Sequence, residues 1–288
     1  MQKTSSLEPK SALCSSESKN NPLVSVVITT KNEEKNIENC LRSIKNQTFK
    51  NIELIVVDNF SEDKTVEIAK KYTVKVYLKG NERSSQRNYG AKVASGKYLF
   101  YLDADMILSQ KVIEECVEKC EREGVDALYV PERIVGEGFW IKVRDFERGF
   151  YTGTILDAVR FIRKDLFEGV AGFDESLAGP EDWDFDRKIR RVGRTEIIHA
   201  TLYHNESSFD IKRYLAKKKY YSSGIQKYIK KWGSNDPEVT KQTGVRYRLM
   251  GVFIEKGNWK KLIKHPPLML AMYYLRFRVG AGYLQSKR

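Results

Sequence analysis

Short apolar runs rich in β-branched residues alternate with helical patterns along the first 130 residues. Strands are expected at 23–29, 52–57, 74–78, 98–102 and 127–130. Apolar residues recur at helical spacing in 32–47, 63–71, 83–94 and 111–124. Such alternation, with a period of about 25 residues, is typical of a parallel, Rossmann-like sheet flanked by helices and joined by right-handed crossovers. The sequence therefore predicts an α/β fold, and 288 residues allow one large domain or one domain with an appendage.

Three of the expected strands end in polar residues. Residues 29–32 follow the first strand, Asp58 and Asn59 end the second, and Asp103-Ala-Asp105 follows the strand at 98–102. Ligands of open α/β sheets bind beyond the carboxyl ends of the strands, so these residues are predicted to lie along one edge, where a nucleotide could bind. Asp103 and Asp105 suit Mg²⁺ or Mn²⁺ held between the protein and a diphosphate. Taken alone, the triplet also fits an ordinary polar turn.

A second acidic group opens the helix expected from residue 181 to about residue 191. Pro180 followed by Glu181 and Asp182 suits a helix N-terminus, where the helix dipole favours acids. Capping alone would explain this cluster without any function. Asp186 lies one turn beyond Asp182, so it could raise the pKa of Asp182 or simply face solvent.

Several short motifs follow one another in order. They are Val24-Ser-Val-Val-Ile-Thr-Thr-Lys-Asn-Glu33, Glu53-Leu-Ile-Val-Val-Asp58 with Ser61-x-Asp63-x-Thr65, Arg87-Asn88-x-Gly90, Gly96-Lys-Tyr, Asp103-Ala-Asp105, Gly172-Phe-Asp-Glu175 and Glu181-Asp182. Each is weak alone, but their order resembles family 2 glycosyltransferases, which are inverting enzymes of the GT-A fold. The resemblance covers roughly residues 22–205. It implies a GT-A catalytic domain over 21–205, with a basic α-helical extension over 206–288.

The resemblance also implies the reaction. A nucleotide sugar would donate its sugar to an acceptor hydroxyl with inversion, while Mn²⁺ or Mg²⁺ neutralises the departing diphosphate. Asp105 would bind the metal, and Asp103 the ribose or sugar as well as the metal. Asp182 would be the base that takes the proton of the acceptor hydroxyl, and Glu181 would orient or bind the acceptor.

The family's nucleotide contacts map to Thr29 and Asn32 after the first strand and to Asp58 and Asn59 after the second. Asn59 departs from the commoner second Asp. An amide both donates and accepts hydrogen bonds, whereas a carboxylate only accepts them. UDP-, GDP- and dTDP-sugars therefore all remain open as donors.

Three further cationic or neutral side chains are candidates at the same site. Arg83 and Arg87 could contact the diphosphate or the sugar, or they could be ordinary surface arginines. His204 follows the expected last strand, 197–203, where members of the family often place a ligand of the metal or the diphosphate. Neutral imidazole suits Mn²⁺, although a lone histidine is more often structural.

The net charge of +13 is concentrated near the C-terminus. Residues 1–204 carry 32 Lys and Arg against 33 Asp and Glu, whereas residues 205–288 carry 19 against 5. The apolar run 266–275 is too short to cross a bilayer, which takes about 20 residues. The helix expected at 268–284 is instead predicted to lie on an anionic membrane surface, which would suit a lipid-linked glycan acceptor at the cytoplasmic face. Alternatively, it packs on the catalytic domain and the acceptor is soluble.

Other functional classes fit less well. Basic residues interleaved with aromatics also suit nucleic acid, but no such motif is present and the acidic edge would repel phosphates, so no nucleic-acid partner is expected. A nucleotidyltransferase would need a Gly-rich phosphate loop at 29–34, which is not there. Four cysteines without zinc spacing are expected to be free thiols in a reducing compartment: Cys14, Cys40, Cys116 and Cys120. Residues 1–20 are expected to be disordered and lack an apolar signal core, which favours a cytoplasmic location.

Overall fold

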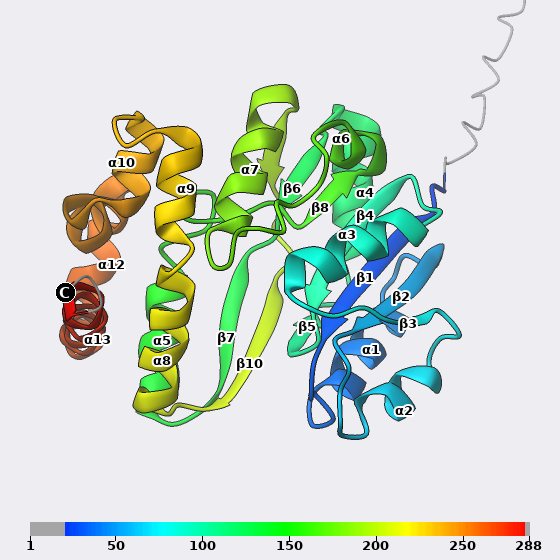
Figure 1. Cartoon of the computed structure of the whole chain (residues 1–288), viewed down its shortest axis with the longest axis horizontal. Coiled ribbons are helices and arrows are strands. Elements are labelled where there is room, and N and C mark those ends of the chain that lie inside the picture. Colours follow the sequence, from blue (N-terminus) through cyan, green and yellow to red (C-terminus); the bar gives the residue numbers. More distant parts are fainter. Residues whose placement is uncertain (1–20, 286–288) are drawn as a thin grey trace, which may run out of the picture.

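A computed structural model describes residues 21–285, apart from the side chains of residue 208 and of residues 282–285 (Figure 1). The predicted disordered segment 1–20, with Cys14, lies outside the described residues. Cys40, Cys116 and Cys120 are free and buried, as expected. The main sheet has seven strands in the order β3-β2-β1-β4-β8-β6-β9. These are β1 (Val24–Thr30), β2 (Ile52–Asp58), β3 (Val76–Leu78), β4 (Tyr98–Asp103), β6 (Ala127–Tyr129), β8 (Phe161–Arg163) and β9 (Thr195–Ile197).

The sheet is mostly parallel. β3, β2, β1 and β4 are parallel neighbours, β8 is antiparallel to β4 and β6, and β6 is parallel to β9. β1 is buried along its whole length. Strands covered on both faces read as continuous apolar runs, which is why the first strands are visible in the sequence. The predicted α/β fold is confirmed.

Helices cover both faces of the sheet because successive side chains of a strand point to opposite sides. Val26 and Ile28 of β1 pack with α1, α2 and α4, whereas Val27 packs with α3, α6 and α7. These helices are α1 (Ile37–Lys45), α2 (Thr65–Lys70), α3 (Arg83–Val93), α4 (Val112–Glu123), α6 (Lys164–Gly169) and α7 (Glu181–Val192). The helix predicted at 32–47 begins only at Ile37, since Asn32 adopts a left-handed backbone with φ 54°.

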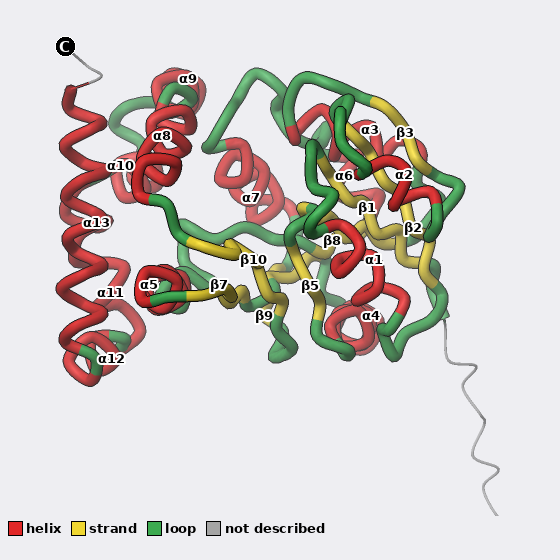
Figure 2. The backbone as a smooth tube through the Cα atoms, turned by 90° about the horizontal axis from the view of Figure 1, so that it is seen from below, coloured by secondary structure: helices red, strands yellow, loops and turns green. Residues whose placement is uncertain are grey.

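A second, three-stranded sheet was not predicted from the sequence. It consists of β5 (Met106–Leu108), β10 (Leu202–Ser208) and β7 (Glu132–Glu137), with β10 in the centre. Figures 1 and 2 show β7 and β10 leading away from the main sheet towards the C-terminal helices. The predicted strand 197–203 is wrong, because β9 ends at Ile197 and β10 starts at Leu202. His204 therefore lies inside β10, where it pairs with β5 and β7, and does not follow a strand.

Most of the C-terminal helices share an apolar core with α5 (Phe139–Arg148), whereas those that carry Tyr228 and Val239 pack with Leu177 and Trp183 near the start of α7 (Figure 2). The C-terminal helices are α8 (Ile211–Ser222), α9 (Ile225–Trp232), α10 (Pro237–Thr243), a π-helical turn η1 (Tyr247–Gly251), α11 (Val252–Ile254), a 3₁₀ turn η2 (Glu255–Gly257), α12 (Trp259–Lys264) and α13 (Pro266–Gln285). Met272 and Leu275 of α13 join Val143 and Phe150 in a separate apolar core. Among residues 21–285, none of the helices combines the length and apolar character needed to cross a bilayer.

Candidate active site

The register of the parallel strands brings their polar ends to one edge. Thr30 of β1 lies beside Asp58 of β2, and Thr29 lies beside Asp103 of β4. A side chain that sequence reasoning missed holds this edge to α3. Gln86 is buried and its amide donates to two strand-end carbonyls, at 3.0 Å to Thr30 and at 2.7 Å to Val57. Because Arg83 and Arg87 lie on the same helix as Gln86, these two hydrogen bonds also position the two candidate arginines.

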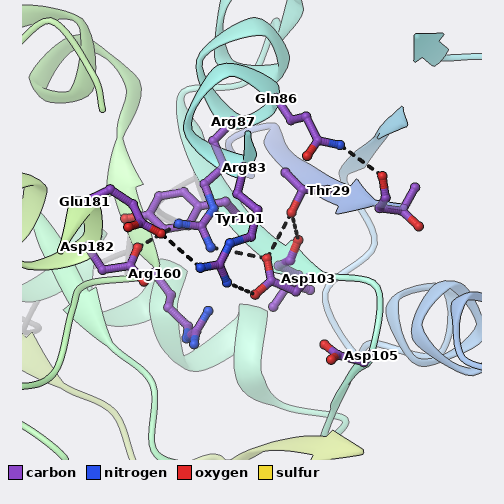
Figure 3. Close-up of polar contacts among 12 residues, drawn as sticks. Thr29, Arg83, Gln86, Arg87, Tyr101, Asp103, Asp105, Arg160, Glu181 and Asp182 are labelled. Carbon is purple, nitrogen blue, oxygen red and sulfur yellow. Dashed lines mark hydrogen bonds and ion pairs between the residues drawn. The ribbon is translucent and has the colours of Figure 1, made fainter. Parts of the chain in front are cut away.

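Asp103 lies within a shell of donors (Figure 3). Its Oδ1 accepts from Thr29 Oγ1 at 2.9 Å and from Arg87 Nη2 at 3.2 Å, and its Oδ2 is 3.5 Å from Arg83 Nη1. Burial would raise the pKa of Asp103, but Arg87, Arg83 and Arg160 outweigh burial and hold this pKa below its usual range. Asp103 is therefore an anion that already has cationic partners.

The same two arginines connect α3 to the start of α7. Arg87 Nη1 is 2.6 Å from Asp182 Oδ1, and Arg83 Nη2 is 3.0 Å from Glu181 Oε1. The Arg87 side chain is 2% exposed, which excludes the reading of this residue as an ordinary surface arginine. Two residues of α3 and two of α7, helices that are far apart in the sequence, thus meet at the end of β4.

The acids of α7 differ in their surroundings. Glu181 is buried, and burial together with the nearby Asp182 raises its pKa against the opposing effect of the arginines. The Asp182 side chain is 36% exposed and can be approached from solvent. Asp186 faces neither Asp182 nor solvent: it is buried, accepts from the Val159 amide at 3.3 Å and pairs with Arg190 at 2.7 Å.

Asp105 turns away from the arginines and contacts the second sheet. Its Oδ2 is 3.0 Å from His204 Nε2, and His204 Nδ1 is 3.1 Å from Glu132 Oε1. Burial lowers the pKa of His204, but the hydrogen bonds with the two carboxylates outweigh it and raise this pKa to about 10. The β10–β5 and β10–β7 pairings bring the three side chains together.

Glu132 is a further site residue that sequence reasoning missed. Its other oxygen, Oε2, is bound by Arg148 at 3.0 Å and by Arg160 at 2.9 Å. These arginines and His204 outweigh burial and keep the pKa of Glu132 well below its usual range. Glu132 therefore orients the His204 ring and connects it to Arg160, which also acts on Asp103.

The Asp105–His204 pair fits a hard or borderline divalent cation. Asp105 Oδ1 is buried without a hydrogen-bond partner. His204 Nε2 could join it as a ligand once a bound cation displaces the proton that Nε2 shares with Asp105, and carboxylate with neutral imidazole is a donor set that suits Mn²⁺. Within residues 21–285, however, no three His, Cys, Asp or Glu side chains form a group able to hold a metal by themselves. A cation bound here would therefore need further oxygens, such as those of a diphosphate.

The candidate base-binding residues have different surroundings after β2. Asp58 accepts from the Ser61 amide at 2.7 Å and from the Ser61 hydroxyl at 2.5 Å, and Asn32 Oδ1 accepts from the Glu62 amide at 2.9 Å. Both side chains therefore hold the loop that follows β2. The Asn59 side chain makes no hydrogen bond within the described part of the chain, which leaves its amide open to a ligand.

Residues 25–176 match the model of Glycosyl transferase family 2. The chain belongs to this family. It is 32% identical over 216 residues to the uncharacterized glycosyltransferase EpsJ of Bacillus subtilis, covering 63% of this chain and 60% of EpsJ. It is also 30% identical over 135 residues to the poly(ribitol-phosphate) β-N-acetylglucosaminyltransferase TarP of Staphylococcus aureus, covering 44% of this chain and 41% of TarP. The chain thus spans about three fifths or less of the length of these relatives.

Solved structures confirm the GT-A-like architecture of this family 2 chain. The mannosyltransferase PcManGT of Pyrobaculum calidifontis, solved with GDP-Man and Mn²⁺, superposes with a TM-score of 0.57 at 16% identity, covering 93% of this chain and 81% of PcManGT. S. aureus TarS 1–349, solved with UDP-GlcNAc, superposes with a TM-score of 0.54 at 17% identity, covering 91% of this chain and 89% of that one. At such identities the likeness concerns the fold alone.

Proposed function

We propose that the chain is a metal-dependent inverting glycosyltransferase that moves a sugar from a nucleotide donor to an acceptor hydroxyl. The observation that carries this proposal is the meeting of Asp103, Arg83 and Arg87 with Glu181 and Asp182 at the carboxyl end of β4. Family membership supports the reaction class. PcManGT and TarS, solved with GDP-Man and UDP-GlcNAc, make a nucleotide sugar a reasonable donor for this chain.

The geometry supports the roles that the family resemblance implies. Asp182 is the most accessible carboxylate of the group and would accept the proton of the acceptor hydroxyl, while Arg87 holds its position. Glu181 is buried and would orient Arg83 towards the donor. Asp103 would contact the ribose or the sugar. No covalent intermediate is needed, because one in-line displacement inverts the anomeric carbon.

Asp105 and His204 would hold Mn²⁺ or Mg²⁺ together with diphosphate oxygens of the donor. When bound, the cation would neutralise charge on the leaving diphosphate. Arg83 and Arg87 would add positive charge on the opposite side of Asp103. Thr29, Asn32, Asp58 and Asn59 would bind the nucleoside, with Asn59 as the side chain that reads the base.

The test is a thermal-shift panel of UDP-, GDP- and dTDP-sugars, each with Mn²⁺, with Mg²⁺ or with EDTA. A ligand present at 100 times its Kd stabilises the fold by about 2.7 kcal/mol, which is readily visible. One nucleotide class should stabilise the protein, with metal only, and Asp105→Ala should remove that shift. Stabilisation that is equal with EDTA would refute the metal, and silence of every donor would refute the nucleotide-sugar proposal.

We also propose that the acceptor is a glycan held near a membrane surface. On α13, Leu270, Tyr274 and Phe277 are 66%, 45% and 63% exposed and share one helix face. Lys260, Lys261 and Lys264 lie on the neighbouring α12. An exposed apolar stripe beside cations suits binding in the plane of an anionic membrane. A soluble glycan acceptor, with these residues merely solvated, is the alternative.

A further inference from the structure

A second group of charged side chains lies between α5, α8, η1 and α13, outside the candidate active site. It contains four cations, which we call the cationic cluster: Arg144, Lys218, Arg248 and Arg276. Two carboxylates accompany them. Glu147 is 2.6 Å from Arg144 and 3.5 Å from Arg276, and Glu206 is 3.3 Å from Arg144. With both acids counted, the three arginines leave an excess of one positive charge, and Lys218 adds up to one more.

Several members of the cationic cluster are only partly compensated. Arg144 Nε is buried without a hydrogen-bond partner, and Arg276 Nε has only the 3.5 Å ion pair with Glu147. Within residues 21–285, Lys218 has no hydrogen-bonded carboxylate; it lies over the Tyr214 ring at 5.5 Å and interacts electrostatically with Glu147. Burial and the neighbouring arginines lower the pKa of Lys218 to about 7. Cations that are largely removed from water and only partly compensated are costly, so an anion bound here would lower that cost.

Hydroxyl groups and an unusual backbone turn surround the same cations. Tyr151 donates to Glu147 at 2.7 Å and accepts from Arg276 at 2.7 Å, and the Tyr214 ring stacks on Arg144 at 4.9 Å. Arg248 lies on the π-helical turn Tyr247–Gly251, and such turns occur frequently at functional sites. These features indicate a constructed site that ordinary helix packing would not require.

Two contacts join the cationic cluster to the acceptor side of the candidate active site. Arg248 lies 5.6 Å from the ring centroid of Trp183, the residue after Asp182. On α8, Tyr214, Lys218 and Tyr221 follow at spacings of four and three residues and so share one face. The Tyr221 ring is 5.2 Å from Arg83. One face of α8 therefore extends from the cluster to the candidate donor arginine, a distance of about 10 Å.

We propose that the cationic cluster binds a phosphate group carried by the acceptor, as a monoester or diphosphate. The excess reaches two positive charges when Lys218 is protonated, and a bound anion favours that protonation; this matches a phosphate monoester, which carries about −1.5 to −2 at neutral pH. An arginine guanidinium can donate two parallel hydrogen bonds to two oxygens of one phosphate. That the phosphate belongs to an acceptor rests on the proposed function. Phosphate binding itself can be measured without any sugar transfer.

The experiment titrates the whole chain with glycerol 3-phosphate in metal-free buffer and measures Kd by calorimetry. Lys218→Gln and Arg248→Gln remove partly exposed cations and should each raise Kd at least tenfold. Lys218→Arg keeps the charge and should stay within threefold of wild type. Lys219→Gln is the matched control, because Lys219 is the exposed neighbour on the same helix. Unchanged Kd in Lys218→Gln and Arg248→Gln, or no binding by wild type, would overturn the proposal.

A second arm identifies the source of the phosphate. Phosphatidylcholine vesicles containing phosphatidic acid carry the same glycerol phosphate on a lipid, and vesicles containing phosphatidylglycerol carry charge without a phosphate monoester. Sedimentation that prefers phosphatidic acid and is lost in Lys218→Gln supports a lipid-borne phosphate. Calorimetric binding of glycerol 3-phosphate that is lost in Lys218→Gln, without that vesicle preference, supports a soluble one. Sedimentation that is unaffected by Lys218→Gln, with no calorimetric binding, overturns the proposal.

The donor panel separates this proposal from the proposed function. Lys218→Gln should keep the wild-type thermal shift with donor and metal, because Lys218 has no contact with Asp103 or Asp105. A silent panel combined with phosphate binding would refute the enzyme and leave the phosphate site standing. A donor-induced thermal shift without phosphate binding would support the enzyme and refute the phosphate site.

Discussion

Arg87 is the residue on which the candidate site most depends. It is almost fully buried and is bonded to carboxylates on two different elements, Asp103 and Asp182. Its guanidinium also lies 5.4 Å from the Tyr101 ring and 5.1 Å from the Phe173 ring. Removing one partner of a buried ion pair costs about 3–5 kcal/mol, because the remaining charge loses its compensation. Arg87 therefore sets both the position of Asp182 and the charge that Asp182 and Asp103 present to a substrate.

Asp182→Asn tests the proposed base at this scale. The amide can still accept a hydrogen bond from Arg87, but it cannot take up a proton, so turnover should fall by about 10²–10⁴-fold. Donor binding should stay within about threefold of wild type when it is measured by titration with the metal present. Turnover close to that of wild type would show that another group is the base. Asp165→Asn, a change to an exposed carboxylate on α6, is the matched control.

At the scale of elements, the position of α3 depends on one close approach to β1. A Cβ on Gly90 would lie 2.2 Å from Cγ1 of Val27, whose side chain is buried. This glycine lets the helix approach the sheet closely enough for Gln86 and the two arginines to reach the strand ends. The Arg87-Asn88-x-Gly90 motif thus has a packing reason as well as a chemical one.

Gly90→Ala should destabilise the fold by about 1–3 kcal/mol, as overpacking usually does. It should also weaken donor binding, because α3 carries Arg83 and Arg87. Urea unfolding and the donor thermal shift measure the two effects. Gly169→Ala is the control, since no atom lies within 4 Å of the added Cβ at that helix end. Equal stability of both variants would mean that the space between α3 and β1 can accommodate a methyl group.

The acid that anchors α7 predicts a pH dependence. Burial raises the pKa of Asp186 to about 6, against the opposing effect of Arg190, whereas an unfolded aspartate titrates near pH ~4. The folded state thus binds the proton more tightly, and this contribution to stability is full below pH ~4 and is lost as the pH rises through about 6. The free energy of unfolding should lose up to about 3 kcal/mol across this window. Urea titrations should show that Asp186→Asn lacks this loss, while the exposed Glu118→Gln keeps it.

How much the sequence predicts differs between elements. The strands from β1 to β4 are apolar runs buried on both faces, and their polar ends were correctly placed at one edge. β7 and β10 escaped prediction because much of their sequence is polar: Glu132, Arg133 and Glu137 in β7, and residues 204–208 in β10. Asp105 and His204 were both named as candidates, whereas Glu132 follows Pro131 without any motif. Only the tertiary pairing of β10 with β7 reveals its role.

At the scale of the whole molecule, the uneven charge has a structural counterpart. The whole excess of Lys and Arg lies in residues 205–288, most of whose helices share an apolar core with α5. The predicted helix at 268–284 is confirmed as α13, and one of its faces packs on the domain while another is exposed. Packing and membrane contact are therefore compatible in this chain and do not exclude each other.

The wild-type chain should sediment with phosphatidylcholine vesicles that contain phosphatidylglycerol at low salt, and less so as salt rises, since each basic residue near the surface adds about 1 kcal/mol. The double change Leu270→Glu and Phe277→Glu should abolish sedimentation by removing the apolar stripe. Val192→Glu, which alters an exposed apolar residue of α7, should have no effect. No sedimentation by wild type at low salt would refute the membrane proposal.

The contacts of α8 with the start of α3 have a consequence for regulation. Tyr220 donates to Glu82 and Tyr221 lies over Arg83, so the basic segment touches Arg83, which is proposed to meet the donor, and the residue before it. Coupling between two binding events is reciprocal in free energy. If these contacts couple the two events, whatever the C-terminal helices bind, a surface or an acceptor, would change donor affinity by the same factor by which the donor changes that attachment. The affinity of the chain for its donor would then depend on whether its C-terminal helices are bound to that surface or acceptor.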